Sequence, residues 1–471
     1  MRADSQVICT CPKKSKTNKL SKTCSPKSCK KKSQTKNSYC INSFNIQPYL
    51  NSHVNLFPGF EYRQNQLYIE NVDLSALCLE YGTPCYVYSK AALQQQWNEL
   101  CQAFDTHNFL ACYAVKANSN LALLQLLASW GAGFDIVSVG ELMRVLEAGG
   151  SPDKIMFSGV AKREDELRAA IHHQIACINV ESEFELEKIK LLAEEMQMPV
   201  RVSLRINPDV NPKTHPYIAT GLKENKFGID SELALSLYQS IKDHQWVKAV
   251  GVDCHIGSQI TETQPHQDAA RLVMEFVGKL SSLGIELQHV DMGGGFGIRY
   301  KDEQPPTFQE FAKLLLPMFK GTDYQLIVEP GRSIVANAGV LLTNVEYIKQ
   351  TSVTEFVMVD VAMNDLLRPA LYQAWHELLP LQQHAERSET HYDVVGPVCE
   401  SGDFLAKNRT MKTLLPEDKL AIMSAGAYAM SMASNYNSRQ RPCELLVDGD
   451  EVHLIRRRDA LDELWQNEVQ L

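Results

Sequence analysis

Between residues 108 and 331, short apolar or β-branched runs alternate eight times with segments of helical periodicity. A parallel strand needs a long crossover before the next one, and a helix normally supplies it. Eight such units in about 225 residues favour a closed (β/α)8 TIM-type barrel over an open, doubly wound sheet. The pattern predicts strands at 108–115, 133–138, 154–159, 176–180, 201–206, 249–257, 287–293 and 325–331, with intervening helices that include 182–196 and 265–283.

The segments on either side of this repeat follow another pattern. Residues 62–69 and 84–89 are predicted strands around a short helix near 74–81, and after Arg332 short strands and turn signals follow. Asp448-Gly449 between two apolar runs is typical of a hairpin turn. We predict a tail (1–50), strands (51–89) that join a C-terminal β-sandwich or β-barrel domain (334–471), and the barrel itself (90–333).

Charge is distributed unevenly along the chain. Residues 1–50 carry eleven Lys and Arg against one Asp, about +10, and since the whole chain carries −9 the remainder carries about −19. An acidic body argues against nucleic acid as the main partner. No apolar run approaches the length of a membrane span. We therefore expect neither nucleic acid nor a membrane as a partner.

The basic segment 1–50 has almost no apolar periodicity, so we predict that it is disordered. It lacks the hydrophobic stretch of a secretory signal and the Arg-rich amphipathic helix of a transit peptide. Its cysteines form no C-x2-C pairs, which argues against a metal site. The other cysteines, such as Cys78, Cys112, Cys177 and Cys254, lie in apolar runs and are expected to be reduced core residues of a cytoplasmic protein.

Polar residues follow every predicted barrel strand at the point where it ends. Chemistry in a (β/α)8 barrel takes place at the carboxyl ends of the strands, so this common placement predicts a site there. The residues are Lys116, Asp135 and Ser138, Ser158, Glu181, Arg205 and Asn207, His255 and Ser258, the glycines 293–295, and the run Glu329-Pro330-Gly331-Arg332.

Lys116 lies in Tyr113-Ala-Val-Lys-Ala-Asn118, at the end of the first predicted strand. A partly desolvated lysine can lose its proton near neutral pH and form a Schiff base with an aldehyde cofactor. A solvated surface lysine is the alternative. The polar residues at the other strand ends favour the cofactor lysine.

A site for pyridoxal 5'-phosphate also needs a partner for the ring nitrogen, a group against the ring and a phosphate cradle. Glu329 is the candidate for the ring nitrogen, with an ion pair to Arg332 or Arg205 as the alternative. His255 is the candidate for the ring face, with a core histidine as the alternative. Gly294 and Gly295 allow backbone amides to approach a phosphate, with a tight turn as the alternative. Hydroxyl groups of Ser258 and Tyr428 are further candidates for phosphate binding.

Several motifs from about residue 55 to the C-terminus resemble the fold-type III pyridoxal-phosphate decarboxylases, most closely the diaminopimelate decarboxylase family. They are Tyr113–Asn118, Gly133-Phe134-Asp135, Cys254–Gln259, the glycine triplet, Glu329–Arg332, Arg368-Pro369-Ala370-Leu371-Tyr372, Cys399–Asp403 and Ala425–Tyr428.

The resemblance implies a role for each matching residue. Lys116 holds the cofactor, and Cys399 donates a proton. The implied cofactor contacts are Asp135, His255, Ser258, Gly294, Gly295, Glu329, Pro330, Gly331, Arg332 and Tyr428, and the implied substrate contacts are Arg332, Arg368, Tyr372, Glu400 and Tyr428.

The same resemblance implies a homodimer in which Cys399 and Glu400 complete the partner's site. Arginine binds carboxylates bidentately, so Arg332 and Arg368 suit the distal carboxylate of a diamino-dicarboxylic acid, and Glu400 suits its distal ammonium. The related ornithine-type enzymes have an aspartate after the cysteine and a substrate without a distal carboxylate. The expected reaction is decarboxylation of meso-2,6-diaminopimelate, a small amino acid, to L-lysine. A surface salt bridge for Arg368 and a buried structural thiol for Cys399 are the alternatives.

Two other functions compete with this one. An amino-acid racemase on the same barrel would have an arginine at the ring nitrogen, and Glu329 argues against it. A regulatory binder without activity would typically have lost the lysine or the phosphate contacts, and all of these positions are filled here.

Overall fold

The computed structural model describes residues 54, 57–212, 214–218, 220–221 and 225–471. All of them belong to one compact unit, Ile46–Leu471. The predicted disordered tail (1–50) and its cysteines lie outside the described residues.

Eight parallel strands close into a barrel, as predicted. Each strand pairs with the next along the chain, and the last closes the barrel on the first through pairs such as Leu326↔Phe109. The predicted strand 249–257 ends earlier than expected because its last residues form a loop that carries site residues. The strands are β5 (Phe109–Ala114), β6 (Gly133–Ile136), β7 (Ile155–Phe157), β8 (Cys177–Val180), β9 (Val200–Arg205), β10 (Val247–Asp253), β11 (His289–Asp291) and β12 (Gln325–Val328).

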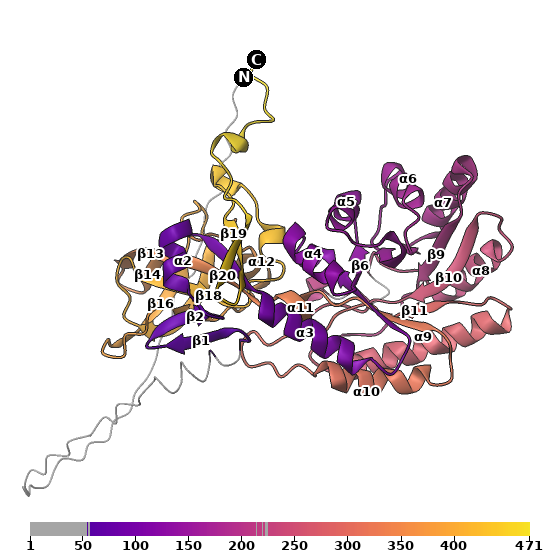
Figure 1. Cartoon of the computed structure of the whole chain (residues 1–471), viewed down its shortest axis with the longest axis horizontal. Helices are drawn as coiled ribbons and strands as arrows, with labels where there is room; N and C mark the ends of the chain where they lie inside the picture. Colours follow the sequence, from indigo (N-terminus) through magenta and orange to yellow (C-terminus); the bar gives the residue numbers. More distant parts are fainter. Residues whose placement is uncertain (1–53, 55–56, 213, 219, 222–224) are drawn as a thin grey trace, which may run out of the picture. The chain divides into compact units, whose positions relative to one another are not determined.

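The helices that alternate with these strands lie on the outside of the barrel (Figure 1). Their apolar faces pack against the strands in one large buried core, as the predicted periodicity requires. They are α3 (Lys90–Ala103), α4 (Leu121–Ser129), α5 (Val139–Glu147), α6 (Glu164–His172), α7 (Glu183–Met196), α8 (Ser231–Ile241), α9 (Gln264–Ser282), α10 (Phe308–Phe319) and α11 (Arg332–Val335).

A separate small apolar cluster joins five of the barrel strands: Cys112, Met156, Cys177, Val250 and Ile327. The cysteines expected in the core, Cys78, Cys112, Cys177 and Cys254, are buried and free, which confirms that prediction.

A second sheet contains strands from both sides of the barrel in the sequence. β4 (Cys85–Ser89) pairs with β13 (Gly339–Gln350) on one side and with β19 (Cys443–Asp448) on the other. The remaining strands are β14 (Glu355–Val359), β15 (Leu378–Pro380), β16 (Glu389–Val395), β17 (Phe404–Lys412), β18 (Lys419–Ile422) and β20 (Glu451–Arg456), with the short helix α12 (Arg368–Tyr372) between β14 and β15. The predicted hairpin is present, because Asp448 pairs with Glu451 across a two-residue turn. The exact domain boundaries stay a prediction.

The single strand predicted at 62–69 is wrong. Two strands, β1 (Phe60–Arg63) and β2 (Gln66–Ile69), form a hairpin there and make a small sheet with β3 (Val72–Asp73). Gln64 and Asn65 have φ angles of 50° and 70°, which match the two left-handed residues of a tight hairpin turn. The helix expected near residue 74 is α2 (Leu74–Tyr81). Within the described part of the chain, no helix has the length and apolar character needed to cross a membrane.

The loop after β18 contacts the turn that carries Lys116. The Tyr428 N–H donates to Ala117 O (2.8 Å), and Asn118 Nδ2 donates to Gly426 O (3.0 Å). Gly426 is packed so closely against the backbone of Val335 and Ala336 that a Cβ atom there would overlap the Val335 carbonyl oxygen. The loop, the end of α11 and the lysine turn are therefore packed directly against one another.

We predict that Gly426→Ala destabilises the protein by at least about 2 kcal/mol, since backbone must move to make room for the methyl group. Gly278→Ala in α9 is the matched control, because a Cβ there would meet no atom within 4 Å. The control should gain about 0.5–1 kcal/mol, because alanine favours a helix over glycine. Urea unfolding measures both changes, and equal midpoints for the two variants would contradict the packing described.

Candidate active site

Lys116 lies just after β5, in a single 3-10 turn (Val115–Ala117). Its Nζ donates to Asp135 Oδ2 at 2.6 Å, and Asp135 is fully buried on β6 with Oδ1 unpartnered. Burial opposes a charge on Lys116, but the carboxylates of Asp135 and Glu329 outweigh it, so the pKa of Lys116 is raised. Lys116 as it lies here therefore holds its proton more firmly than an isolated amine does, and its Schiff-base role stays a prediction.

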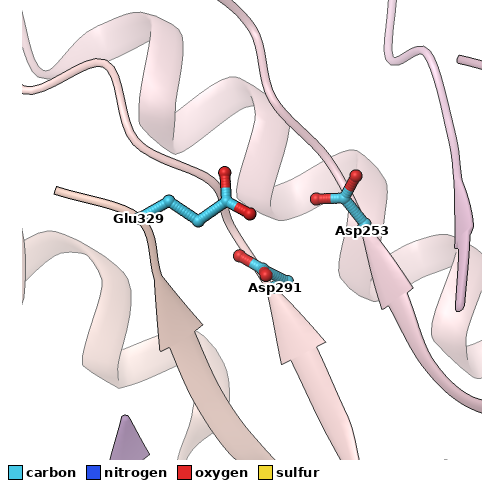
Figure 2. A group of neighbouring side chains, drawn as sticks. All are labelled: Asp253, Asp291 and Glu329. Carbon is cyan, nitrogen blue, oxygen red and sulfur yellow. The ribbon is translucent and has the colours of Figure 1, made fainter. Parts of the chain in front are cut away.

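Three more buried carboxylates gather where neighbouring strands end (Figure 2). Asp253, Asp291 and Glu329 place oxygen atoms within 4.8 Å of one another. Burial and mutual repulsion raise the pKa of Asp291 and of Glu329 well above the ordinary range. Burial raises the pKa of Asp253 to about 7, although Arg205 opposes that shift. The cluster therefore binds protons more tightly than isolated carboxyl groups do.

The alternative ion pairs for Glu329 are excluded. Arg205 Nη1 donates to Glu181 Oε1 at 2.8 Å, and its Nε lies 3.8 Å from Asp253 Oδ2. Arg332 donates to hydroxyl groups instead. Glu329 Oε1 accepts a hydrogen bond from Ser158 Oγ at 3.4 Å. Glu329 thus has no arginine partner, and its carboxylate is close enough to Lys116 to act on the pKa of that amine.

His255 follows β10 and is a neutral imidazole. The Gly294 N–H donates to its Nδ1 at 3.0 Å, so Nδ1 carries no proton. Burial, with Arg205 and Lys116 nearby, lowers the pKa of His255 well below its usual value. The approach of Nδ1 to Glu329 Oε2 (3.8 Å) is therefore not an ion pair.

The glycine triplet after β11 is required by close packing. A Cβ atom at Gly293 would lie 2.6 Å from Cys254 O, and one at Gly295 would lie 2.6 Å from Gly257 O. The Gly293 N–H donates to Asp291 Oδ1 (2.9 Å) and the Gly294 N–H to His255, whereas the Gly295 N–H has no partner among the described residues. The Gly295 amide is thus the one of the three that is available to an anion.

Two buried arginines contact the ring of Tyr300. Arg332 Nη1 donates to its hydroxyl at 2.6 Å, and the Arg368 guanidinium lies 4.4 Å from its ring centroid. Arg332 Nη2 also donates to Ser258 Oγ at 3.0 Å. In the described ranges neither guanidinium forms an ion pair, and both Nε atoms lack a partner. Buried cations without a counter-ion form a candidate anion-binding site. The surface salt bridge considered for Arg368 is excluded.

The two predicted tyrosines lie beside these arginines. The Arg332 guanidinium is 4.7 Å from the ring centroid of Tyr428, and Tyr428 has a left-handed φ of 52°. Tyr372 follows Arg368 on α12 and meets His215 edge-on at 5.9 Å.

Cys399 and Glu400 lie apart from the Lys116 cluster. Both are exposed, so the buried structural thiol considered for Cys399 is excluded. Asn437 Oδ1 accepts from the Cys399 N–H (2.9 Å), and Glu400 Oε2 accepts from the Tyr436 hydroxyl (2.9 Å). In the part of the chain that is described, neither side chain contacts Lys116, Asp135 or Glu329.

Five residues of this region were not predicted. Asp253 and Asp291 end barrel strands, so the strand-end rule could have found both. Tyr300 and His376 lie in loops, and Tyr436 begins a single 3-10 turn (Tyr436–Ser438). These segments have no periodicity, and the partners of the three residues are distant in the sequence.

Comparison with known proteins identifies the class. Residues 90–336 match the family model described as pyridoxal-dependent decarboxylase, pyridoxal binding domain. The diaminopimelate decarboxylase of Pseudomonas aeruginosa is 50% identical over 409 residues, which cover 87% of this chain and 98% of that protein. The solved diaminopimelate decarboxylase of Helicobacter pylori in complex with L-lysine has a TM-score of 0.82 at 42% identity, covering 84% of this chain and 99% of that one. The chain belongs to the diaminopimelate decarboxylase family.

The cofactor of this class, pyridoxal phosphate, fits the residues present. The buried Asp135 and Glu329 carboxylates, the neutral His255, the free Gly295 amide and Lys116 supply the four kinds of contact that it needs.

We predict that Asp253→Asn changes how stability depends on pH. With a pKa of about 7, the folded wild type binds more protons at Asp253 than the unfolded chain does between pH 4 and 7. Its free energy of unfolding therefore falls as pH rises through that window, by up to about 1.4 kcal/mol per pH unit from this group. Urea unfolding of cofactor-free protein at pH 5 and 7.5 should show a smaller fall for the variant. Equal falls would mean that Asp253 is ionised throughout.

Proposed function

We propose that this protein removes carbon dioxide from meso-2,6-diaminopimelate and yields L-lysine, the last step of lysine biosynthesis. The family assignment supports the reaction, and the relatives solved with L-lysine support the product. We further propose that it acts in the cytoplasm, in keeping with its free thiols.

The observation that carries the proposal is the pair of buried arginines without carboxylate partners. Leaving two guanidinium groups buried and unpaired is costly unless a ligand neutralises them. Diaminopimelate has one carboxylate to lose and a second to be held. Arg332 and Arg368 bind the second carboxylate, with Tyr372 and Tyr428 beside them.

Lys116 holds the cofactor covalently in this proposal, and Asp135 keeps its amine in place. Glu329 would meet the ring nitrogen and His255 would lie against the ring. Gly295, Ser258, Tyr428 and the neighbouring segment Pro330–Arg332 would hold the phosphate, with Gly294 positioning His255. When bound, pyridoxal phosphate supplies an electron-withdrawing ring that stabilises the charge left by departing carbon dioxide. The Glu329 carboxylate, when ionised, would stabilise a protonated ring nitrogen.

The remaining roles require a second subunit. We propose a homodimer in which Cys399 of the partner subunit donates the proton to the product carbon and Glu400 of the partner subunit binds the distal ammonium. The exposure of both side chains, and their lack of contact with the Lys116 cluster of their own chain, support this arrangement. Tyr436 orients the Glu400 carboxylate through its hydroxyl group.

We predict that Lys116→Ala abolishes both turnover and the visible absorbance of the bound cofactor, because it removes the amine that would hold the cofactor. Release of carbon dioxide from diaminopimelate, lysine and ornithine, measured side by side, should favour diaminopimelate at least about 100-fold in kcat/KM. Loss of optical activity from L-lysine or L-ornithine without gas release would instead indicate a racemase.

A mixing experiment tests the shared site. Lys116→Ala and Cys399→Ala should each be nearly inactive alone. Random exchange of subunits should restore about a quarter of wild-type activity, because half of the dimers would contain one intact site of two. Mixing Lys116→Ala with Lys116→Ala,Cys399→Ala is the control and should restore none. No recovery in the first mixture, despite proven subunit exchange, would place both residues in one chain's site.

A further inference from the structure

His376 is a fully buried histidine that holds Arg368. Its Nε2 lies 2.8 Å from Arg368 Nη1, and its Nδ1 lies 2.8 Å from the carbonyl oxygen of Met423. A guanidinium only donates hydrogen bonds, and a carbonyl only accepts them. Nε2 must therefore be the unprotonated acceptor and Nδ1 the donor, which fixes one tautomer of a neutral ring.

The surroundings keep this imidazole neutral. Burial, together with the charges of Arg368, Arg409 and Arg332, lowers the pKa of His376 well below its usual value. The Tyr300 ring packs edge-on against it at 5.5 Å, and Arg409 Nη2 donates to its backbone carbonyl at 2.8 Å. No carboxylate faces the ring among the residues described.

A comparison within the molecule shows what a neutral partner achieves. The buried Arg205 is held by the carboxylate of Glu181 at 2.8 Å, so its charge is already compensated. Arg368 is held just as closely, but by an uncharged acceptor. One donor is used to fix the position of the guanidinium, while its full charge and its other donors remain for a ligand.

We propose that His376 is a positioning residue that fixes Arg368 for the second carboxylate of the substrate and thereby determines specificity for it. The inference deepens the proposed function and rests on it. A substrate or product that keeps this carboxylate depends on His376, and a ligand that lacks it does not.

Two ligands separate these cases. L-lysine keeps the carboxylate that remains after decarboxylation, whereas cadaverine has the same carbon chain and both amines without it. We expect His376→Phe in the holoenzyme to raise the inhibition constant of L-lysine and the KM of diaminopimelate by about 10- to 100-fold, the range for a lost hydrogen bond to a charged group. The inhibition constant of cadaverine and the cofactor absorbance should stay within about twofold.

Three companion variants make the test specific. His376→Gln has an acceptor and a donor and should recover most of the lysine affinity. His107→Phe is the matched control, because His107 contacts a backbone carbonyl, Tyr324 O at 3.0 Å, at the amino ends of the barrel strands. In an Arg368→Met background, His376→Phe should add no further loss, since the group that it positions is gone. His376→Leu replaces the phenylalanine variant should that one not fold.

The outcomes separate this inference from the proposed function. Wild-type release of carbon dioxide from diaminopimelate tests the function alone, and calorimetric binding of L-lysine tests His376 without turnover. Unchanged lysine binding in His376→Phe would overturn the inference. An equal loss of lysine and cadaverine binding, or multiplied losses in the double variant with Arg368→Met, would do so as well.

Discussion

The ion pair between Lys116 and Asp135 is the interaction on which the site depends. It joins the ends of two neighbouring barrel strands and fixes the amine among four buried carboxylates. Charge therefore keeps the lysine in place before any cofactor arrives, at the expense of its reactivity as a free amine. The loop that carries Tyr428 also helps to fix Lys116, because it forms a backbone hydrogen bond to the lysine turn.

The sequence predicts the barrel and the strand-end residues because one rule links them: parallel strands present their carboxyl ends on one side. Lys116, Asp135, His255 and Glu329 were found in this way. Their protonation could not be predicted, since the pKa of Lys116 depends on the carboxylates of Asp135 and Glu329, which come from two other strands of the barrel. His376 and Tyr300 were missed for a related reason. The role of each depends on contacts between segments that are distant in the sequence, and no local sequence pattern indicates such contacts.

The molecule uses its buried arginines in two ways. Arg205 has carboxylate partners and serves the architecture of the barrel. Arg332 and Arg368 have partners without charge, a phenol ring, hydroxyl groups and an imidazole, and these leave the positive potential uncompensated. A buried arginine with a carboxylate partner is structural, whereas one with only uncharged partners is available to bind a ligand. The residue type alone does not distinguish the two roles.

The position of β4 has a consequence for synthesis of the chain on the ribosome. β4 lies in the middle of its sheet, between β13 and β19, and Cys85 and Cys443 face each other although 358 positions separate them. A nascent chain therefore exposes one edge of β4 until translation is almost finished. All five residues of β4 are buried in the folded protein. We therefore expect the unpaired edge of β4 to be a site where chaperones protect the nascent chain from aggregation.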